Sequence, residues 1–171
     1  MNRLVLSLLL APLLAPAGAL SNRPAPAFRL TDATGRAVSL ADYKGKFLVL
    51  EFMNTTCPHC QKFVPVLESV QTRFKGRVGV VSIATHPDNA RTVAEFAKNY
   101  KTSFPILLDP QNTAAQDYLK PGPPSYGFSI PHLFLIDSSG FIRDDFSQNA
   151  ANSQFFTPEG FARLVQGYLG R

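Results

Sequence analysis

Nearly uninterrupted apolar runs alternate along the chain with segments of helical spacing. Residues 47–53 and 78–84 are almost entirely apolar, which is typical of central strands covered on both faces of a sheet. Residues 89–100 carry apolar side chains every three or four positions and follow Asp88, which we expect to be the N-cap of a helix. This alternation predicts an α/β fold, a central mixed β-sheet flanked by helices.

Residues typical of turns and helix starts predict where the remaining strands and helices begin and end. Asp32-Ala33-Thr34-Gly35 is a turn sequence, so residues 27–40 should form an N-terminal β-hairpin. A proline at the first helical position predicts one helix from Pro58 to about Phe74. Further expected elements are a strand at 105–108, a helix at 113–119, a hairpin of 132–137 with 141–145, and a helix from Pro158 to about Leu169 capped by Thr157.

The chain begins with the pattern of an export signal. Arg3 supplies a positive charge, residues 4–14 are largely apolar, and Ala17-Gly18-Ala19 offers a small-x-small cleavage site. A retained membrane anchor is the alternative. Pro12 and Pro16 interrupt the apolar segment, however, and it is shorter than the roughly 20 residues that a spanning helix needs.

We therefore divide the 171 residues into a signal peptide (1–19), an extended arm (20–27) and one domain (28–171). We expect an exported, periplasmic or otherwise extracytoplasmic monomer without an integral membrane span after cleavage. Hydrophobic residues make up 45% and charged residues 17%, as in ordinary domains with a core. The net charge of +5 is dispersed, with no block of five Lys or Arg residues, so we expect no nucleic-acid partner.

The only two cysteines, Cys57 and Cys60, form a Cys-Pro-His-Cys motif. A disulfide that closes so short a loop removes little chain entropy, so redox chemistry explains the pair better than stabilisation. One turn apart at a helix start, the two Cβ atoms would lie about 5–6 Å from each other, close enough for a reversible disulfide. The helix N-terminus favours the thiolate of Cys57, and the more shielded Cys60 would resolve a mixed disulfide. We expect no cofactor beyond this redox-active disulfide.

Together with its surroundings, the motif resembles the thioredoxin superfamily, and in particular the TlpA/ResA-like extracytoplasmic branch of redoxin, or AhpC/TSA, proteins. The resemblance implies a thioredoxin-like fold. It also implies a thiol–disulfide oxidoreductase that serves cell redox homeostasis by exchanging electrons with protein thiols and disulfides and with a redox partner protein. The matching stretches are Phe28–Lys46, Phe47–Cys60, Phe104–Asp109 and Ile130–Asp137.

The resemblance also implies a peptide-binding edge beside the cysteines. Pro131 would be the cis-proline that faces the motif, and the backbone of Ile130 would pair with an incoming peptide like an added strand. Pro58 would contact the same substrate. The alternative for Pro131 is an ordinary trans proline at the start of a strand.

Two titratable residues complete the expected site. Glu51, the only charge within 47–53, matches a buried acid that accepts the proton of the resolving cysteine in thioredoxins, and burial would raise its pKa toward neutrality. The alternative is a solvated carboxylate at a strand edge. His59 could stabilise the Cys57 thiolate and make the disulfide more oxidising, or it could be a solvated bystander. Its Pro-His dipeptide is typical of DsbA-like oxidases, whereas the overall resemblance points to a reductase, so the direction of electron flow stays open.

Two stretches depart from the family pattern. Asn54-Thr55-Thr56 stands where the family usually has an aromatic residue directly before the first cysteine, which makes this approach more polar. Residues 120–125 look longer than the usual connection to the cis-proline, and we interpret them as a tolerated surface insertion.

Two other functions compete with disulfide exchange. A thiol-dependent peroxidase would need Pro and Thr or Ser seven and three residues before its cysteine, but Leu50 and Asn54 occupy those positions. A copper- or other metal-binding protein could use both cysteines with His59, His86 or His132, of which His132 beside Pro131 is the best placed. Copper-delivery relatives, however, space their cysteines more widely.

Overall fold

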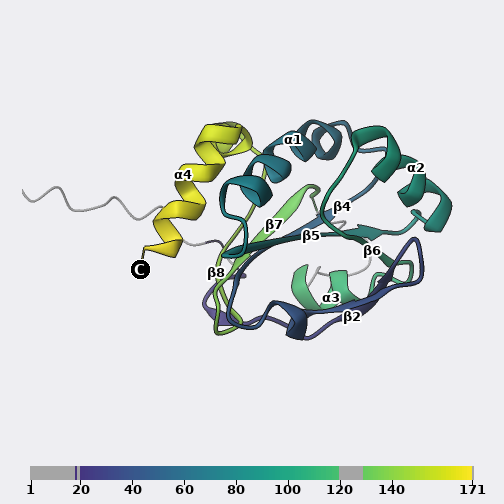
Figure 1. Cartoon of the computed structure of the whole chain (residues 1–171), viewed down its shortest axis with the longest axis horizontal. Helices are drawn as coiled ribbons and strands as arrows, with labels where there is room; N and C mark the ends of the chain where they lie inside the picture. Colours follow the sequence, from purple (N-terminus) through teal and green to yellow (C-terminus); the bar gives the residue numbers. More distant parts are fainter. Residues whose placement is uncertain (1–17, 19, 120–128, 171) are drawn as a thin grey trace, which may run out of the picture.

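An eight-stranded mixed sheet organises the computed structural model, which describes residues 18, 20–119 and 129–170 (Figure 1). The strand order is β1-β8-β7-β4-β5-β6-β2-β3. At its centre, β4 (Phe47–Met53), β5 (Val78–Thr85) and β6 (Ile106–Asp109) run parallel. The predicted mixed sheet flanked by helices is therefore confirmed. The predicted signal peptide, apart from Gly18, and the predicted insertion at 120–125 lie outside the described residues.

Antiparallel strands extend the sheet on both sides. The predicted N-terminal hairpin is present: its two strands pair with each other, and the first also pairs with β6. On the other side β7 pairs with β4, and β8 pairs with β7. The arm contributes β1 (Arg23–Pro24), which pairs with β8 at the sheet edge. The remaining strands are β2 (Arg29–Asp32), β3 (Ala37–Ser39), β7 (His132–Ile136) and β8 (Phe141–Ser147).

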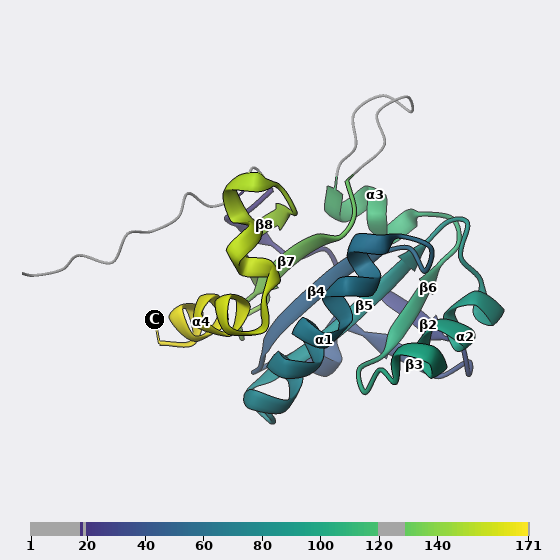
Figure 2. The same ribbon diagram turned by 90° about the horizontal axis from the view of Figure 1, so that it is seen from above.

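Helices cover both faces of the sheet. Figures 1 and 2 show α1 (Pro58–Arg73), α2 (Ala90–Tyr100) and α4 (Pro158–Leu169) on one face, and Figure 1 shows α3 (Thr113–Leu119) on the other. Because strand side chains alternate between the two faces of the sheet, β4 contributes to the hydrophobic core on each face. Val49 and Met53 pack under α1, whereas Leu50 and Phe52 pack with Tyr118 of α3. Two 3₁₀ helices, η1 (Leu40–Tyr43) and η2 (Ala150–Phe156), complete the fold. Across the described ranges, no helix is both long and apolar enough to cross a bilayer.

One predicted helix cap is wrong. Asn89, not Asp88, is the N-cap of α2, and its side chain accepts the N–H groups of Arg91 and Thr92. Asp88 is engaged elsewhere, as described below. The cap predicted for the last helix is confirmed, because Thr157 accepts the N–H of Gly160.

Candidate active site

The two cysteines lie where the central strand β4 gives way to α1. Cys57 is the N-cap of α1, and its Sγ accepts the N–H of Cys60 at 3.3 Å. Both side chains are free thiols. Cys57 is half-buried, whereas Cys60 is only 1% exposed. One accessible sulfur at a helix N-terminus therefore stands in front of a shielded one, as the sequence predicts.

The peptide that precedes β7 lies beside Cys57. The Ile130–Pro131 bond is cis, so the trans alternative is wrong. The Cys57 thiol lies 3.8 Å from the carbonyl oxygen of Ile130 and donates to it. Ile130 is half-buried and Pro131 is buried. Two segments that are 73 residues apart thus meet at the reactive sulfur.

Glu51 is buried in the middle of β4 with 2% exposure, which excludes the solvated strand-edge alternative. Its cross-strand neighbour in β5 is Ser82, whose hydroxyl donates to Glu51 Oε2 at 2.5 Å. The other carboxylate oxygen, Oε1, is buried and has no hydrogen-bond partner among the described residues. Burial raises the pKa of Glu51 to about 8, although the hydrogen bond from Ser82 acts in the opposite direction.

The charge of Glu51 acts on the thiol of Cys60. Burial raises the pKa of the Cys60 thiol far above its usual range, and the negative charge of Glu51 raises it further. Glu51 has the same side-chain parity along β4 as Val49 and Met53, which pack in the cluster that contains Cys60. The pair therefore favours holding one proton between the two groups over losing both.

His59 occupies the exposed first turn of α1. It borders a small cavity of about 130 Å³ together with Lys62, Phe63, Gln148 and Phe156. Within the part of the chain that the structure describes, its ring forms no hydrogen bond or ion pair. Its predicted effect on the Cys57 thiolate therefore stays a prediction. Pro58, the adjacent substrate-binding candidate, is exposed too.

A buried carboxylate that we did not assign to the site holds the turn in front of Cys57. Asp88 is 6% exposed and accepts the N–H of Thr55 at 2.7 Å and its hydroxyl at 2.5 Å. The hydroxyl of Thr92 in α2 donates to the same carboxylate at 2.9 Å. The sequence does hold a signal for this role of Asp88. Asp88 and Asn89 are both suited to cap a helix, and since only one of them can be the N-cap, the other is available for a different contact.

Other polar contacts complete this turn. The amide of Asn54 donates to the carbonyl oxygen of Thr85 at 2.9 Å, and Gln61 Nε2 donates to the carbonyl oxygen of Thr55 at 2.8 Å. The N–H of Cys57 donates to the carbonyl oxygen of Asn54 at 3.1 Å. The polar residues directly before Cys57 therefore form a hydrogen-bonded support for that cysteine.

We expect Asp88→Ala to lower the free energy of unfolding by about 2–3 kcal/mol, because buried donors of Thr55 lose their acceptor. Loss of the support should also loosen the contact between Cys57 Sγ and the Cys60 N–H and slow alkylation of Cys57 at pH 7 by about five- to tenfold. Denaturant unfolding and iodoacetamide kinetics measure the two effects.

Asp109→Ala is the matched control for Asp88→Ala. Asp109 is also a buried carboxylate, and it accepts the N–H groups of Thr113 and Ala115 at the start of α3. Asp109→Ala should lose about as much stability as Asp88→Ala, but its Cys57 should be alkylated at the wild-type rate. Equal alkylation rates in the two variants would show that Asp88 acts on stability alone.

The histidine favoured as a metal ligand faces away from the cysteines. His132 has the side-chain parity of Phe134, on which its ring stacks, in the layer packed with α3. Its Nε2 lies 3.2 Å from Asp145 Oδ2. Among the described residues, no three His, Cys, Asp or Glu side chains are grouped as a metal site would require. His132 is therefore not placed to join the two cysteines in a metal site.

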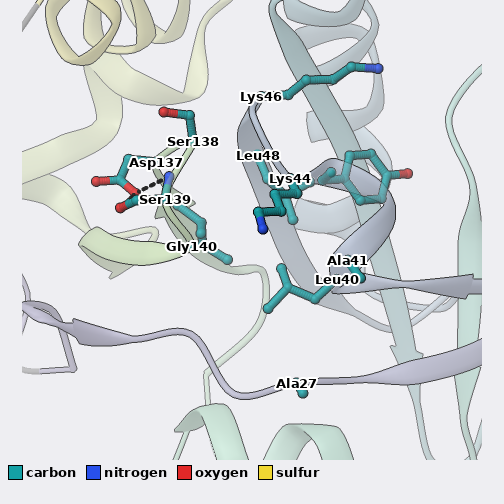
Figure 3. A pocket seen from close by; sticks show the side chains of 12 residues that line it. Ala27, Leu40, Ala41, Lys44, Lys46, Leu48, Asp137, Ser138, Ser139 and Gly140 are labelled. Atoms are coloured by element: carbon teal, nitrogen blue, oxygen red, sulfur yellow. Dashed lines mark hydrogen bonds between the residues drawn. The ribbon is translucent and has the colours of Figure 1, made fainter.

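Figure 3 shows a second cavity, of about 260 Å³. It opens between η1 and the β7–β8 turn, and Leu40, Lys44 and residues 137–140 contribute to its lining. Lys46 and Leu48 bring it to the start of β4, whereas the cysteines follow the end of that strand. This cavity is therefore not part of the thiol site.

Known proteins share both sequence and fold with this chain. A profile of the AhpC/TSA family matches residues 21–145. The thioredoxin-like protein YneN of Bacillus subtilis is 31% identical over 129 residues, which cover 74% of this chain and 71% of YneN. The thiol-disulfide oxidoreductase ResA of Bacillus cereus is 33% identical over 122 residues, or 70% of this chain and 65% of ResA.

The fold matches a solved thioredoxin domain, which confirms the predicted thioredoxin-like fold. That domain belongs to a thiol-disulfide oxidoreductase from Bacteroides vulgatus and superposes with a TM-score of 0.70 at 20% identity. The match covers 86% of this chain and 96% of the domain.

Proposed function

Because the chain belongs to the AhpC/TSA family of thioredoxin-like proteins, we propose that it is an exported thiol–disulfide oxidoreductase that acts on protein thiols and disulfides. The observation that carries this proposal is the geometry at Cys57. Its accessible sulfur lies 3.8 Å from the Ile130 carbonyl oxygen and accepts the N–H of the buried Cys60. ResA, about one third identical, is named a thiol-disulfide oxidoreductase, and the chain spans 65% of its length.

Exchange proceeds in two displacement steps. The Cys57 thiolate attacks one sulfur of a client disulfide, which forms a mixed disulfide and releases the other client sulfur as a thiolate. Cys60 then attacks Cys57 Sγ, which closes the Cys57–Cys60 disulfide and releases the second client thiolate. Two electrons pass from the protein to the client. The reverse sequence oxidises a client dithiol, and a redox partner protein restores the starting state in either case.

Glu51 accepts the proton of Cys60 in the second step. A thiol whose pKa is raised by burial needs a base close by, and Glu51 is the only carboxylate in β4, the strand that leads to the motif. Its unpartnered Oε1 supports this role, because one carboxylate oxygen is free to take up a proton while Ser82 holds the other.

The client binds at the edge formed by Ile130, Pro131 and Pro58. An extended peptide that pairs with the backbone of Ile130 would bring its own sulfur to Cys57. The exposed ring of Pro58 and the half-buried side chain of Ile130 supply apolar contact on either side of that sulfur.

The equilibrium with glutathione tests this function and the role of His59 together. The reduced protein should exchange with glutathione disulfide and end with one intramolecular disulfide, which mass spectrometry detects. His59→Ala should make the protein less oxidising, with an equilibrium constant shifted by about tenfold, or about 30 mV. The exposed His86 provides the control variant, His86→Ala, which should leave the constant unchanged.

No exchange with glutathione or protein disulfides, together with rapid consumption of hydrogen peroxide, would replace the proposal by a peroxidase. Normal exchange with an unchanged constant in His59→Ala would make His59 a bystander.

A further inference from the structure

Two adjacent carboxylates of β8 are buried on opposite sides of the strand. Asp144 is 4% exposed and Asp145 is 6% exposed. Asp144 accepts the hydroxyl of Tyr168 at 2.9 Å, whereas Asp145 faces His132. Within the described ranges no Lys or Arg forms an ion pair with either of them. Burying carboxylates away from Lys and Arg is costly, and the imidazole of His132, whose Nε2 lies 3.2 Å from Asp145 Oδ2, offers Asp145 a positive charge only when it is protonated.

The N-terminal arm directs its backbone at these carboxylates. The N–H of Leu20 donates to Asp145 Oδ1 at 2.8 Å, and the hydroxyl of Ser21 donates to the same oxygen at 2.8 Å. Arg23 Nε donates to the carbonyl oxygen of Leu20 at 2.9 Å. Leu20 is therefore held at both its nitrogen and its carbonyl oxygen.

The nitrogen at Asp145 belongs to the residue that follows the predicted cleavage site. Ala17-Gly18-Ala19 ends at position 19, so cleavage there would make Leu20 the first residue of the mature chain. The Leu20 nitrogen would then be an α-ammonium group in place of an amide.

We propose that Asp145 is the binding site for the α-ammonium group of Leu20 that is created when the Ala19–Leu20 peptide bond is hydrolysed during export. Water is consumed, a leader-cleaving peptidase catalyses the step, and the products are the Ala19 carboxylate and the Leu20 ammonium. The proposal depends on the predicted leader and is independent of the thiol chemistry.

The charge balance of the site favours the cleaved chain. Burial alone would raise the pKa of Asp145, but hydrogen bonds from His132, Ser21 and Leu20 outweigh it and hold that pKa below its usual value. Asp145 is therefore ionised at neutral pH. Replacing an amide by an ammonium turns a neutral hydrogen bond into a charge-assisted one, which is roughly twice as strong.

Cleavage also changes the donors of the neighbouring carboxylate. In the uncut chain, the N–H of Gly18 donates to Asp144 Oδ1 at 3.0 Å, and this donor leaves with the signal peptide. An ammonium group has three N–H donors, so it can keep its bond to Asp145 and provide another for its surroundings. The groups that face this site are His132 from β7, Tyr168 from α4 and Ser21 from the arm.

The test uses the full chain, expressed with its leader in a secreting bacterium and purified after export. Intact mass should place the mature N-terminus at Leu20. A variant with one glycine inserted between Ala19 and Leu20 should mature one residue longer, which moves the ammonium away from Asp145. Its melting temperature should be lower by about 3–6 °C, a shift expected when a charged contact is lost from a domain of this size.

Asp145→Asn and the reactivity of the α-amine complete the test. In the Asp145→Asn background, the protein that begins at Leu20 and the protein that begins at the inserted glycine should have melting temperatures within roughly 1 °C of each other. The position of the ammonium group no longer matters once its acceptor is gone. Should that variant fail to fold, acylation at pH 8 still decides, because the Leu20 amine should react at least about tenfold more slowly than the inserted glycine. Maturation at another residue, or equal melting temperatures and equal acylation rates for the two N-termini, would overturn the proposal.

Discussion

Replacing Cys60 by alanine is expected to trap the protein on its client as a mixed disulfide through Cys57. The first displacement needs only the accessible Cys57 sulfur, whereas release needs the buried thiol behind it. Steady-state reduction of a protein disulfide should fall by roughly a thousandfold or more, the scale seen when a member of a catalytic unit is removed. Non-reducing gels and mass spectrometry measure the adduct and its site.

Cys57→Ala is the control for this trap. It should lose turnover to the same degree without forming any adduct, since Cys60 is 1% exposed and out of reach of a client. An adduct on Cys60, or normal turnover in Cys60→Ala, would contradict the assignment of attacking and resolving sulfurs.

Replacing Glu51 by glutamine should remove a strong pH dependence of stability. The carboxyl has a usual pKa of 4.5, and burial raises it to about 8 in the folded protein. Between these values the folded state holds a proton that the unfolded state has lost, so stability falls as the pH rises. The slope is about 1.4 kcal/mol per pH unit midway between these values, and the loss from pH 5 to 8 is about 3.5 kcal/mol.

Urea unfolding of the reduced wild type and of Glu51→Gln at pH 5, 6.5 and 8 measures this difference. The wild type should lose stability relative to the variant at each step. Ser82→Ala removes the hydrogen bond that lowers the pKa of Glu51, so its loss of stability should extend to higher pH. Parallel pH profiles for all three proteins would mean that Glu51 keeps an ordinary pKa.

Glu51→Gln should also slow the second step of disulfide exchange, the attack by Cys60. Without a base for the Cys60 proton, breakdown of the mixed disulfide should slow by about a hundredfold at pH 8, where about half of the Glu51 carboxyls are ionised. Attack by Cys57 should keep its wild-type rate, because Glu51 serves the second step. A fall in both rates would point to a disturbed fold rather than a lost proton acceptor.

Local patterns were sufficient to predict most elements and the core of the site. The apolar run 47–53 marks β4 with the bounds that the structure has, and prolines at first helical positions mark the starts of α1 and α4. The burial of Glu51 followed from its apolar neighbours in the same strand. These features depend on residues close in sequence, which is where pattern and propensity are informative.

Contacts between distant segments could not be predicted in this way. Asp88 was expected to cap α2, but its carboxylate binds Thr55, which is 33 residues away. The bond between the N–H of Leu20 and Asp145 spans 125 residues, and no local pattern indicates it. Ser82 stood out only after the strand register had placed it beside Glu51.

The outer strands of the sheet are short, and short edge strands protect a protein against aggregation with unfolded chains. An open strand edge offers unpaired backbone groups on which other chains add, the usual route to aggregation. Here the outermost strands, β1 and β3, are only two and three residues long, so they offer little template. Under the proposed function, in which a client pairs with the backbone of Ile130 beside Cys57, these short outer strands give a partly unfolded client little other edge to add to.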